Sequence, residues 1–412
     1  MQIKEASARM IFDSRGNPTL RVTVLTPEGS GWADAPSGAS TGKHEAIELR
    51  DGGTAYHGKG VSKAIENVRV VSDAIRGIEC TDQKKIDQTL IALDGTPNKS
   101  KLGANTTTAV SLAVARAAAV CTGKELFDSI CPGASRLPIP MMNIINGGKH
   151  AGSGLAIQEF MVVPVGAKSF SEAMRMGTEI YHTLKEIIEA KYGKPATSVG
   201  DEGGFAPRIR KTREALDLIV KAIEKSGYAR EVKVSLDCAA SSFFAKDKYK
   251  IDGKSLTKPK LLEYYLSLLN EYPIFSIEDP FDEEDFESFA ALKKECKCRV
   301  IGDDLTVTNV SRIETAINKG AIDTLLLKVN QVGTLTEAID AATLCKNNKC
   351  GVVVSHRSGE TCDPFIADLA VALDCGMIKA GAPCRGERLA KYNRLLEIEH
   401  LLGNKAVYGL PE

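Results

Sequence analysis

Apolar and polar positions follow two different patterns along the chain and divide it into two regions. In the first, a strand-like run at 20–25 precedes a Gly, Ser and Thr loop at 36–42, and apolar residues then recur with helical spacing at 65–75 and 107–119. This order predicts a small α+β domain over 1–131. Three prolines and a glycine within 132–140 place the domain boundary there.

The second region, 132–412, alternates between apolar, β-branched runs and helical segments. Continuous apolar runs separated by helices are typical of a parallel sheet that is buried on both faces. Eight such runs predict a closed (β/α)8 TIM-like barrel and the fold class α/β. Because the first two runs lie too close together for a helical crossover, the second strand is predicted to be antiparallel. The eight runs are 139–145, 160–165, 232–236, 274–277, 300–301, 324–328, 351–354 and 377–379.

Composition and charge narrow the possible partners. Lys plus Arg and Asp plus Glu each total 53, so no net charge favours nucleic acid or an acidic membrane. The eleven cysteines include no CxxC pair, and the first residues contain no apolar signal segment. The apolar stretch 109–121 is interrupted by Arg116 and is too short to span a bilayer. We therefore expect a cytoplasmic protein with reduced thiols that binds neither nucleic acid nor membranes.

Charged residues stand at the end of six consecutive predicted strands. The spacing between most of them matches one strand plus one helix, so they should converge at the C-terminal face of the barrel, where barrel enzymes carry their chemistry. Any one of these residues alone could cap the next helix or be a solvated charge, but six in register indicate a site. They are Asp237, Glu278, Asp303, Lys328, His356 with Arg357, and Lys379.

Three of these residues are carboxylates, which would repel one another unless a cation lay among them. The ligand atoms are all oxygen, so the expected cation is Mg²⁺, or Mn²⁺ as a substitute, rather than zinc. Lys328 beside such a cation could lose its proton and act as a base, and Arg357 could grip a carboxylate or phosphate. These features predict removal of a proton next to a carboxylate, helped by a metal.

Three further segments contain candidate residues. NIINGGKHAG places His150 in a glycine-rich turn, QEF places Glu159 at the start of the second strand, and GDEGGFAP places Glu202 between glycines. That last loop could equally be a structural acidic turn. The segment GASTGKH at 38–44 resembles a phosphate-binding P-loop, but its spacing is one residue short and His44 stands where Ser or Thr must hold Mg²⁺. A mobile lid over the barrel mouth fits this segment better.

The chain resembles the enolase family over essentially its full length. The blocks that carry the resemblance are FDSRGNPT, PSGASTGKHEAIELRD, NIINGGKHAG, QEFMVVPVGA, GDEGGFAP, SIEDPF, GDDLTVTN, LLLKVNQVG, VSHRSGET and IKAGAPCRGERLAKYN. The resemblance implies an N-terminal α+β domain followed by a barrel with an antiparallel second strand. It implies reversible, Mg²⁺-dependent dehydration of 2-phospho-D-glycerate to phosphoenolpyruvate through a metal-stabilised enolate, and a homodimer or homo-octamer.

The resemblance also implies a role for each matching residue. Lys328 matches the base that takes the C2 proton, and Glu202 matches the acid that protonates the leaving 3-hydroxyl. Two Mg²⁺ ions are implied, the second held by the substrate and by Ser40 when the lid closes. The ligands of the first ion match Asp237, Glu278 and Asp303. The substrate-binding residues match His150, Gln158, Glu159, His356, Arg357, Ser358 and Lys379.

Departures from the family pattern lie beside the site and remove no catalytic group. Cys362 stands where many members carry an acid, Gly386 where they carry Ser, and Lys149 where others often carry Ser. Two alternatives remain open. Another lyase or racemase of the enolase superfamily would show a second base, such as a KxK pair at a strand end, and none is visible. A non-catalytic binding protein of enolase ancestry would have lost Lys328, Glu202 or a metal carboxylate.

Overall fold

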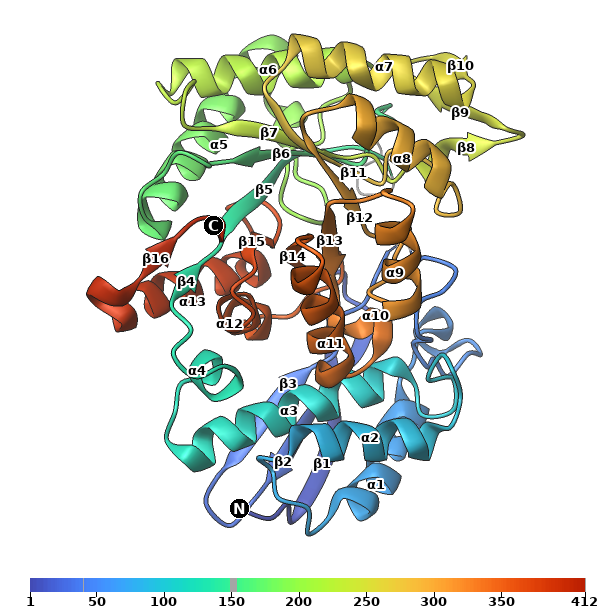
Figure 1. Ribbon diagram of the computed structural model, residues 1–412, viewed down its shortest axis with the longest axis vertical. Coiled ribbons are helices and arrows are strands. Elements are labelled where there is room, and N and C mark those ends of the chain that lie inside the picture. The colour runs from blue at the N-terminus through green and yellow to red at the C-terminus, as the bar shows by residue number, and fades with distance from the viewer. Residues whose placement is uncertain (40, 149–153, 412) are drawn as a thin grey trace.

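A computed structural model describes residues 1–39, 41–148 and 154–411 (Figure 1). Its N-terminal part begins with an antiparallel meander of β1 (Glu5–Phe12), β2 (Pro18–Leu25) and β3 (Ser30–Asp34). The β1–β2 turn is closed by Asp13, whose Oδ1 accepts the backbone N–H groups of Arg15 and Asn17 at 2.9 Å each. Gly16 within the turn has φ +72°, a conformation that favours glycine.

Four helices follow this meander: α1 (Ser62–Ile75), α2 (Gln83–Asp94), α3 (Ala104–Thr122) and α4 (Leu126–Ile130). Helices α1 and α3 pack on its strands, α2 packs on both of these helices, and α4 packs on α3. The alanine-rich α3 is buried almost throughout and packs on β2 and β3. It comes so close that a Cβ at Gly31 would lie 2.1 Å from the backbone nitrogen of Ala117. The predicted strand at 20–25 and helices at 65–75 and 107–119 are therefore confirmed, with α3 longer than expected. A short 3-10 turn, η1 (Ala55–Gly58), precedes α1.

Eight strands close the barrel in the order β11-β12-β13-β14-β15-β5-β6-β7. The strand β6 is antiparallel to both of its neighbours, and the other barrel pairs are parallel. The predicted barrel and its antiparallel second strand are thus confirmed. The strands are β5 (Ile139–Asn146), β6 (Glu159–Val163), β7 (Lys233–Asp237), β11 (Ile274–Glu278), β12 (Arg299–Gly302), β13 (Thr324–Leu327), β14 (Gly351–Ser355) and β15 (Gly376–Lys379).

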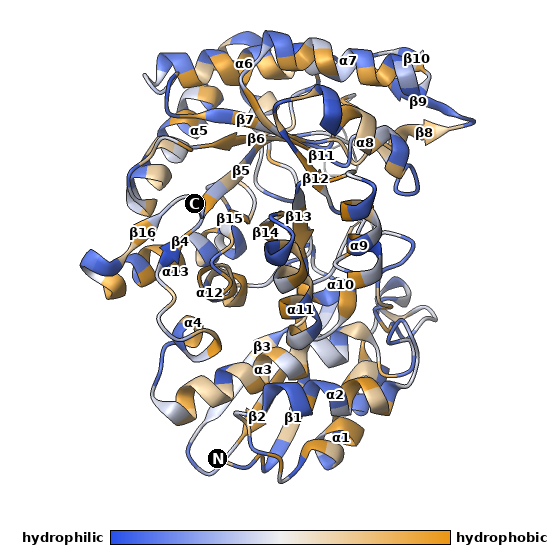
Figure 2. Ribbon diagram, in the orientation of Figure 1, coloured by the Kyte–Doolittle hydropathy of each residue, from blue (hydrophilic) through white to orange (hydrophobic). Residues whose placement is uncertain are grey.

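Helices surround the barrel, with their polar faces outward and their apolar faces toward the strands (Figure 2). The α-helices are α5 (Phe170–Tyr192), α6 (Thr212–Lys225), α7 (Lys258–Glu271), α8 (Phe286–Glu295), α9 (Val310–Asn318), α10 (Val329–Val332), α11 (Leu335–Asn347), α12 (Phe365–Ala372) and α13 (Gly386–Leu402). The 3-10 turns are η3 (Lys194–Thr197), η4 (Ala240–Phe243) and η5 (Gly403–Lys405). No helix of the described residues is long and apolar enough to cross a membrane.

Two small sheets lie outside the barrel. The first, β8 (Phe244–Ala245), β9 (Lys248–Ile251) and β10 (Lys254–Leu256), is an excursion between β7 and α7 that the apolar pattern did not predict. The second pairs β4 (Arg136–Leu137) with β16 (Val407–Tyr408), and so ties the start of the barrel to the end of the chain.

Apolar side chains fill the barrel interior, including Ile139, Met161, Leu326, Val353 and Met377, all at most 2% exposed. The lumen is therefore a packed core, and ligands can bind only at its ends.

The N-terminal domain reaches the C-terminal end of the barrel through the loop that follows β3. Ser37 and Gly359 exchange two backbone hydrogen bonds of 2.8 Å, one in each direction. Ala46 donates its backbone N–H to the carbonyl of Gln331 at 2.8 Å. These contacts hold the residues on either side of Ser40 against the barrel mouth.

Candidate active site

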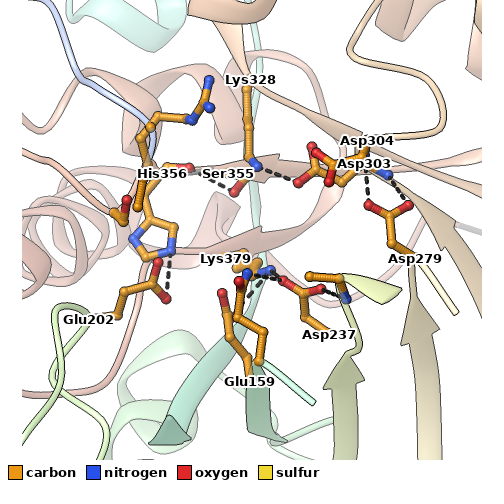
Figure 3. A pocket seen from close by; sticks show the side chains of 16 residues that line it. Glu159, Glu202, Asp237, Asp279, Asp303, Asp304, Lys328, Ser355, His356 and Lys379 are labelled. Atoms are coloured by element: carbon orange, nitrogen blue, oxygen red, sulfur yellow. Dashed lines mark hydrogen bonds and ion pairs between the residues drawn. The ribbon is translucent and has the colours of Figure 1, made fainter. Parts of the chain in front are cut away.

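The three predicted metal carboxylates lie at the ends of neighbouring strands. Asp237 and Glu278 are directly paired in the register of β7 and β11, and Asp303 follows the last residue of β12. All three are buried, with Glu278 fully so. The pairing of β11 with both β7 and β12 therefore brings together residues that are 66 positions apart at the extremes of this set (Figure 3).

Lysine side chains form ion pairs with these carboxylates. The Nζ of Lys379 lies 2.9 Å from Asp237 and from Glu278 and 3.3 Å from Glu159, while Lys328 contacts Asp303. Burial raises the pKa of Glu278 well above its ordinary value, the negative charge of Asp237 raises it further, and Lys379 opposes the rise. The buried cations of the site therefore do not fully offset the negative charge of its buried carboxylates.

A second grouping of acids overlaps the predicted one. Single carboxylate oxygens of Asp279, Asp303 and Asp304 lie within 4.8 Å of one another, a spacing that could also hold a metal ion. Asp279, however, already accepts the backbone N–H groups of Asp303 at 3.1 Å and of Asp304 at 2.7 Å. Its carboxylate is thereby committed to the turn after β12, and Asp303 is the residue common to both groupings.

The donor set fits a hard divalent cation. Asp237, Glu278 and Asp303 offer oxygen alone, which suits Mg²⁺ and not zinc. Gln158 adds an amide, whose Nε2 lies 3.4 Å from Asp237 and whose buried Oε1 has no hydrogen-bond partner among the described residues. An unsatisfied carbonyl oxygen in the wall of an acidic cavity is a further group that a cation, its water or a substrate could satisfy.

Glu202 lies on the other side of the cavity, in the loop that precedes α6. Its backbone carbonyl accepts from Ala382 at 2.9 Å. In the same loop a Cβ at Gly204 would lie 1.9 Å from Asn146 Oδ1, so only glycine allows this close approach. The carboxylate Oε2 accepts from Nδ2 of Asn143 at 3.0 Å and lies 3.4 Å from Nε2 of His356. Glu202 is 2% exposed and is therefore shielded from solvent.

Two neighbouring groups have strongly perturbed acidities. Burial lowers the pKa of His356 to about 4, against an attraction by Glu202 that raises it. Burial raises the pKa of Glu159 well above its usual range, as does the negative charge of Glu202. The histidine is consequently neutral near pH 7. Such paired shifts in one cleft are characteristic of active sites.

Arg357 is held by an acid that the sequence interpretation missed. Glu45, from the loop after β3, accepts from Nη1 at 2.9 Å and from Nη2 at 3.2 Å. Both side chains are buried. The neighbouring Ser358 Oγ lies 3.5 Å from Arg15 Nη1. The N-terminal domain thus supplies the partner of the residue predicted to bind the anionic substrate.

Two of the predicted site residues, Ser40 and His150, lie outside the described residues. The structure brings all the remaining predicted residues except Glu278 to the lining of one cavity: Gln158, Glu159, Glu202, Asp237, Asp303, Lys328, His356, Arg357, Ser358 and Lys379. Glu278 is fully buried and lies behind this lining, where it pairs with Lys379 at 2.9 Å. Besides Glu45, the sequence interpretation missed Asn143. The only signal for it was an asparagine within the apolar run of β5.

An α/β barrel with buried carboxylates and lysines at its C-terminal strand ends has the arrangement of the barrel class of enzymes. Comparison with known proteins narrows this class. Residues 3–130 match the family model described as the enolase N-terminal domain, and residues 134–410 match the enolase C-terminal TIM barrel domain. The chain belongs to the enolase family.

Sequence similarity to known enolases extends over nearly the whole length of the chain. The enolase of Methanocaldococcus jannaschii is 57% identical, covering 98% of this chain and 96% of the relative. Those of Thermococcus kodakarensis and Methanopyrus kandleri are 55% and 53% identical, each covering 99% of this chain and 96% and 98% of the relative. The chain is accordingly a carbon–oxygen lyase of glycolysis that interconverts 2-phosphoglycerate and phosphoenolpyruvate. The family uses a divalent metal, typically Mg²⁺.

Proposed function

We propose that Lys328 and Glu202 divide the dehydration of 2-phospho-D-glycerate between them. Lys328 removes the proton from C2, and Glu202 delivers a proton to the 3-hydroxyl as it leaves. The observation that carries this proposal is their placement: Lys328 stands at the end of β13 and Glu202 on the loop before α6, on different sides of the same cavity (Figure 3). A substrate in the cavity would present opposite sides to the two residues.

The residues around Lys328 explain when it can act as a base. Burial lowers its pKa, as do the charges of Arg357 and Lys379, but the attraction of the surrounding carboxylates, Asp303 first and then Glu278, leaves the pKa above its ordinary value. Neutralising the Asp303 carboxylate is therefore what frees Lys328 to give up its proton. Bound at Asp237, Glu278 and Asp303, Mg²⁺ would supply the positive charge that stabilises the developing enolate.

The remaining groups bind and orient the substrate. Arg357 and Lys379 are the buried cations for the phosphate and carboxylate, Ser358 binds with them, and His356 adds a further polar contact. Gln158, Glu159 and His150 belong on the side of the 3-hydroxyl. A second Mg²⁺ would be held by the substrate and by Ser40 as the lid closes.

Further assignments follow from the family. We place the domain division at 1–131 and 132–412, the location in the cytoplasm, and the assembly as a homodimer or homo-octamer. The matches to the two family models support that division. Size-exclusion chromatography with light scattering measures the assembly directly.

The proposed function is tested by following phosphoenolpyruvate formation from 2-phosphoglycerate, with and without Mg²⁺. Turnover that needs Mg²⁺ and that is lost in Lys328→Ala and Glu202→Gln is the expected result. Retained turnover in both variants would overturn the assigned roles. Racemisation of a different carboxylate would identify another superfamily activity, and inactivity of the metal-loaded chain would indicate a non-catalytic binding protein.

A further inference from the structure

A buried arginine stands directly behind His356, on the side away from Glu202. Arg388, in the first turn of α13, is 0% exposed. Its Nη1 lies 2.7 Å from Nδ1 of His356 and donates to the backbone carbonyl of Arg357, also at 2.7 Å. The imidazole therefore lies between a guanidinium on one side and the Glu202 carboxyl on the other.

This contact determines which nitrogen of His356 carries the proton. A guanidinium can only donate hydrogen bonds, so Nδ1 must accept one with its lone pair. In the neutral ring the proton is then on Nε2, the atom 3.4 Å from Glu202. Doubly protonated imidazole would place an N–H against the guanidinium. Burial lowers the pKa of His356 to about 4, Arg388 lowers it further, and the carboxylates of Glu202 and Glu360 oppose this.

The tautomer matters because of how Glu202 is bound. Asn143 Nδ2 and His356 Nε2 both face the same oxygen, Oε2. Both N–H groups therefore require Oε2 to accept. If His356 instead carried its proton on Nδ1, the lone pair of Nε2 would face Glu202. It would then compete with the leaving hydroxyl for the acid proton.

We propose that Arg388 is a positioning residue for the dehydration: by donating to Nδ1 it holds His356 as an Nε2–H donor, which keeps the proton of Glu202 for the substrate. The inference rests on the acid role proposed above for Glu202. In that step the Glu202 proton joins the departing 3-oxygen, and the C3–O electron pair leaves with it as water. The enolate electrons form the C2–C3 double bond, and Glu202 remains as a carboxylate.

A second arginine of the same segment provides a matched control. Arg388 Nη2 also donates to the carbonyls of Ser358 at 2.5 Å and Asp201 at 3.0 Å, so it clamps loops as well. Arg385 clamps the same region, through the carbonyls of Gly200 at 3.2 Å and Ser14 at 2.9 Å. Its hydrogen bonds in the described part of the chain go to these carbonyls and to Glu387. A loss of clamping alone would thus affect both arginines.

The first experiment needs no variant of Arg388. Two-bond ¹H–¹⁵N correlation spectra of the chain labelled at its six histidines distinguish the Nε2–H, Nδ1–H and imidazolium forms. The His356 signals are assigned by their disappearance in His356→Asn. The expected pattern in the wild-type chain at pH 7 is neutral Nε2–H. An Nδ1–H or imidazolium pattern would overturn the proposal, whatever any variant does.

The second experiment compares Arg388→Met, Arg388→Lys and Arg385→Met. Loss of the donor in Arg388→Met should release the Nδ1–H form and lower kcat for dehydration roughly tenfold or more, with KM and C2 exchange in D₂O little changed. Arg388→Lys, which retains a donor, and Arg385→Met should keep the Nε2–H pattern. If Arg388→Met and Arg385→Met changed kcat and the tautomer pattern equally, Arg388 would only hold the loops together, and the proposal would be refuted. If Glu202→Gln dehydrated normally, the proposed role of Glu202 would fail while the tautomer result stood.

Discussion

The ion pair between Glu45 and Arg357 allows a sharp test of how the N-terminal domain supports the site. Changing Glu45→Gln keeps the size of the side chain but removes its charge and replaces one of its two acceptor oxygens by an NH2 donor. The guanidinium is then left buried without its bidentate partner, since side-chain exposure is 3% for Arg357 and 5% for Glu45. Gly42 also donates its backbone N–H to Glu45 at 2.9 Å, so the loop after β3 loses a charged acceptor at the same time.

The expected magnitude follows from burial. Breaking a buried ion pair by removing one partner costs about 3–5 kcal/mol. At about 2.1 cal/mol/K per residue, the entropy of unfolding of 412 residues is roughly 0.9 kcal/mol/K, so Tm should fall by about 3–6 °C. When 2-phosphoglycerate and Mg²⁺ are present at saturating concentration, the difference in Tm between the variant and the wild type should be smaller, because a substrate anion at Arg357 replaces the lost charge.

Glu48→Gln is the control for this measurement. Glu48 pairs with Arg50 at 2.5 Å, but the two side chains are 26% and 20% exposed, so the loss should be about 1 kcal/mol or less. Differential scanning calorimetry of both variants, with and without ligand, decides the matter. If Glu45→Gln had the same Tm as the wild type, or if the Tm of Glu48→Gln fell as far as that of Glu45→Gln, the role assigned to burial would be refuted.

Four further predictions follow from the same geometry. Chelation with EDTA should abolish turnover and excess Mg²⁺ restore it, and calorimetric titration should show weaker Mg²⁺ binding in Asp303→Asn. Ser40→Ala should lower the turnover number at saturating Mg²⁺ more than it weakens binding of the first Mg²⁺. An unchanged turnover number would show that the loop is only a structural turn. In D₂O, NMR should show no C2 exchange in Lys328→Ala, whereas Glu202→Gln should exchange while dehydrating ~10²-fold more slowly; the opposite pattern would reverse the two roles. The pKa of His356 is about 4 in the folded chain and 6.5 ordinarily, so between these pH values the unfolded chain binds a proton that the folded chain does not. The free energy of unfolding should therefore fall as pH drops from about 6.5 to about 4, by roughly 3 kcal/mol in all. Urea unfolding of His356→Asn should show a shallower decline over the same pH range.

The barrel and the location of its site could be predicted because both depend on local pattern. Apolar runs at 324–328 and 351–354 form β13 and β14, and their ends place Lys328 and His356 at the same face. The antiparallel β6 also followed from the sequence, because a short connection cannot hold a crossover helix. The excursion β8–β10 was missed, since its strands are two to four residues long and pack outside the barrel.

The partners within the site were decided by tertiary structure alone. No spacing along the chain indicates that Glu45 faces Arg357 or that Arg388 lies behind His356, because these pairs are 312 and 32 residues apart and join different elements. Asn143 reaches Glu202 only because β5 lies beside the loop before α6. Periodicity determines which element a residue occupies and which end of the barrel it reaches. The distance between two side chains depends on barrel closure and on the docking of the N-terminal domain, and those distances set the charges, tautomers and pKa values of the site.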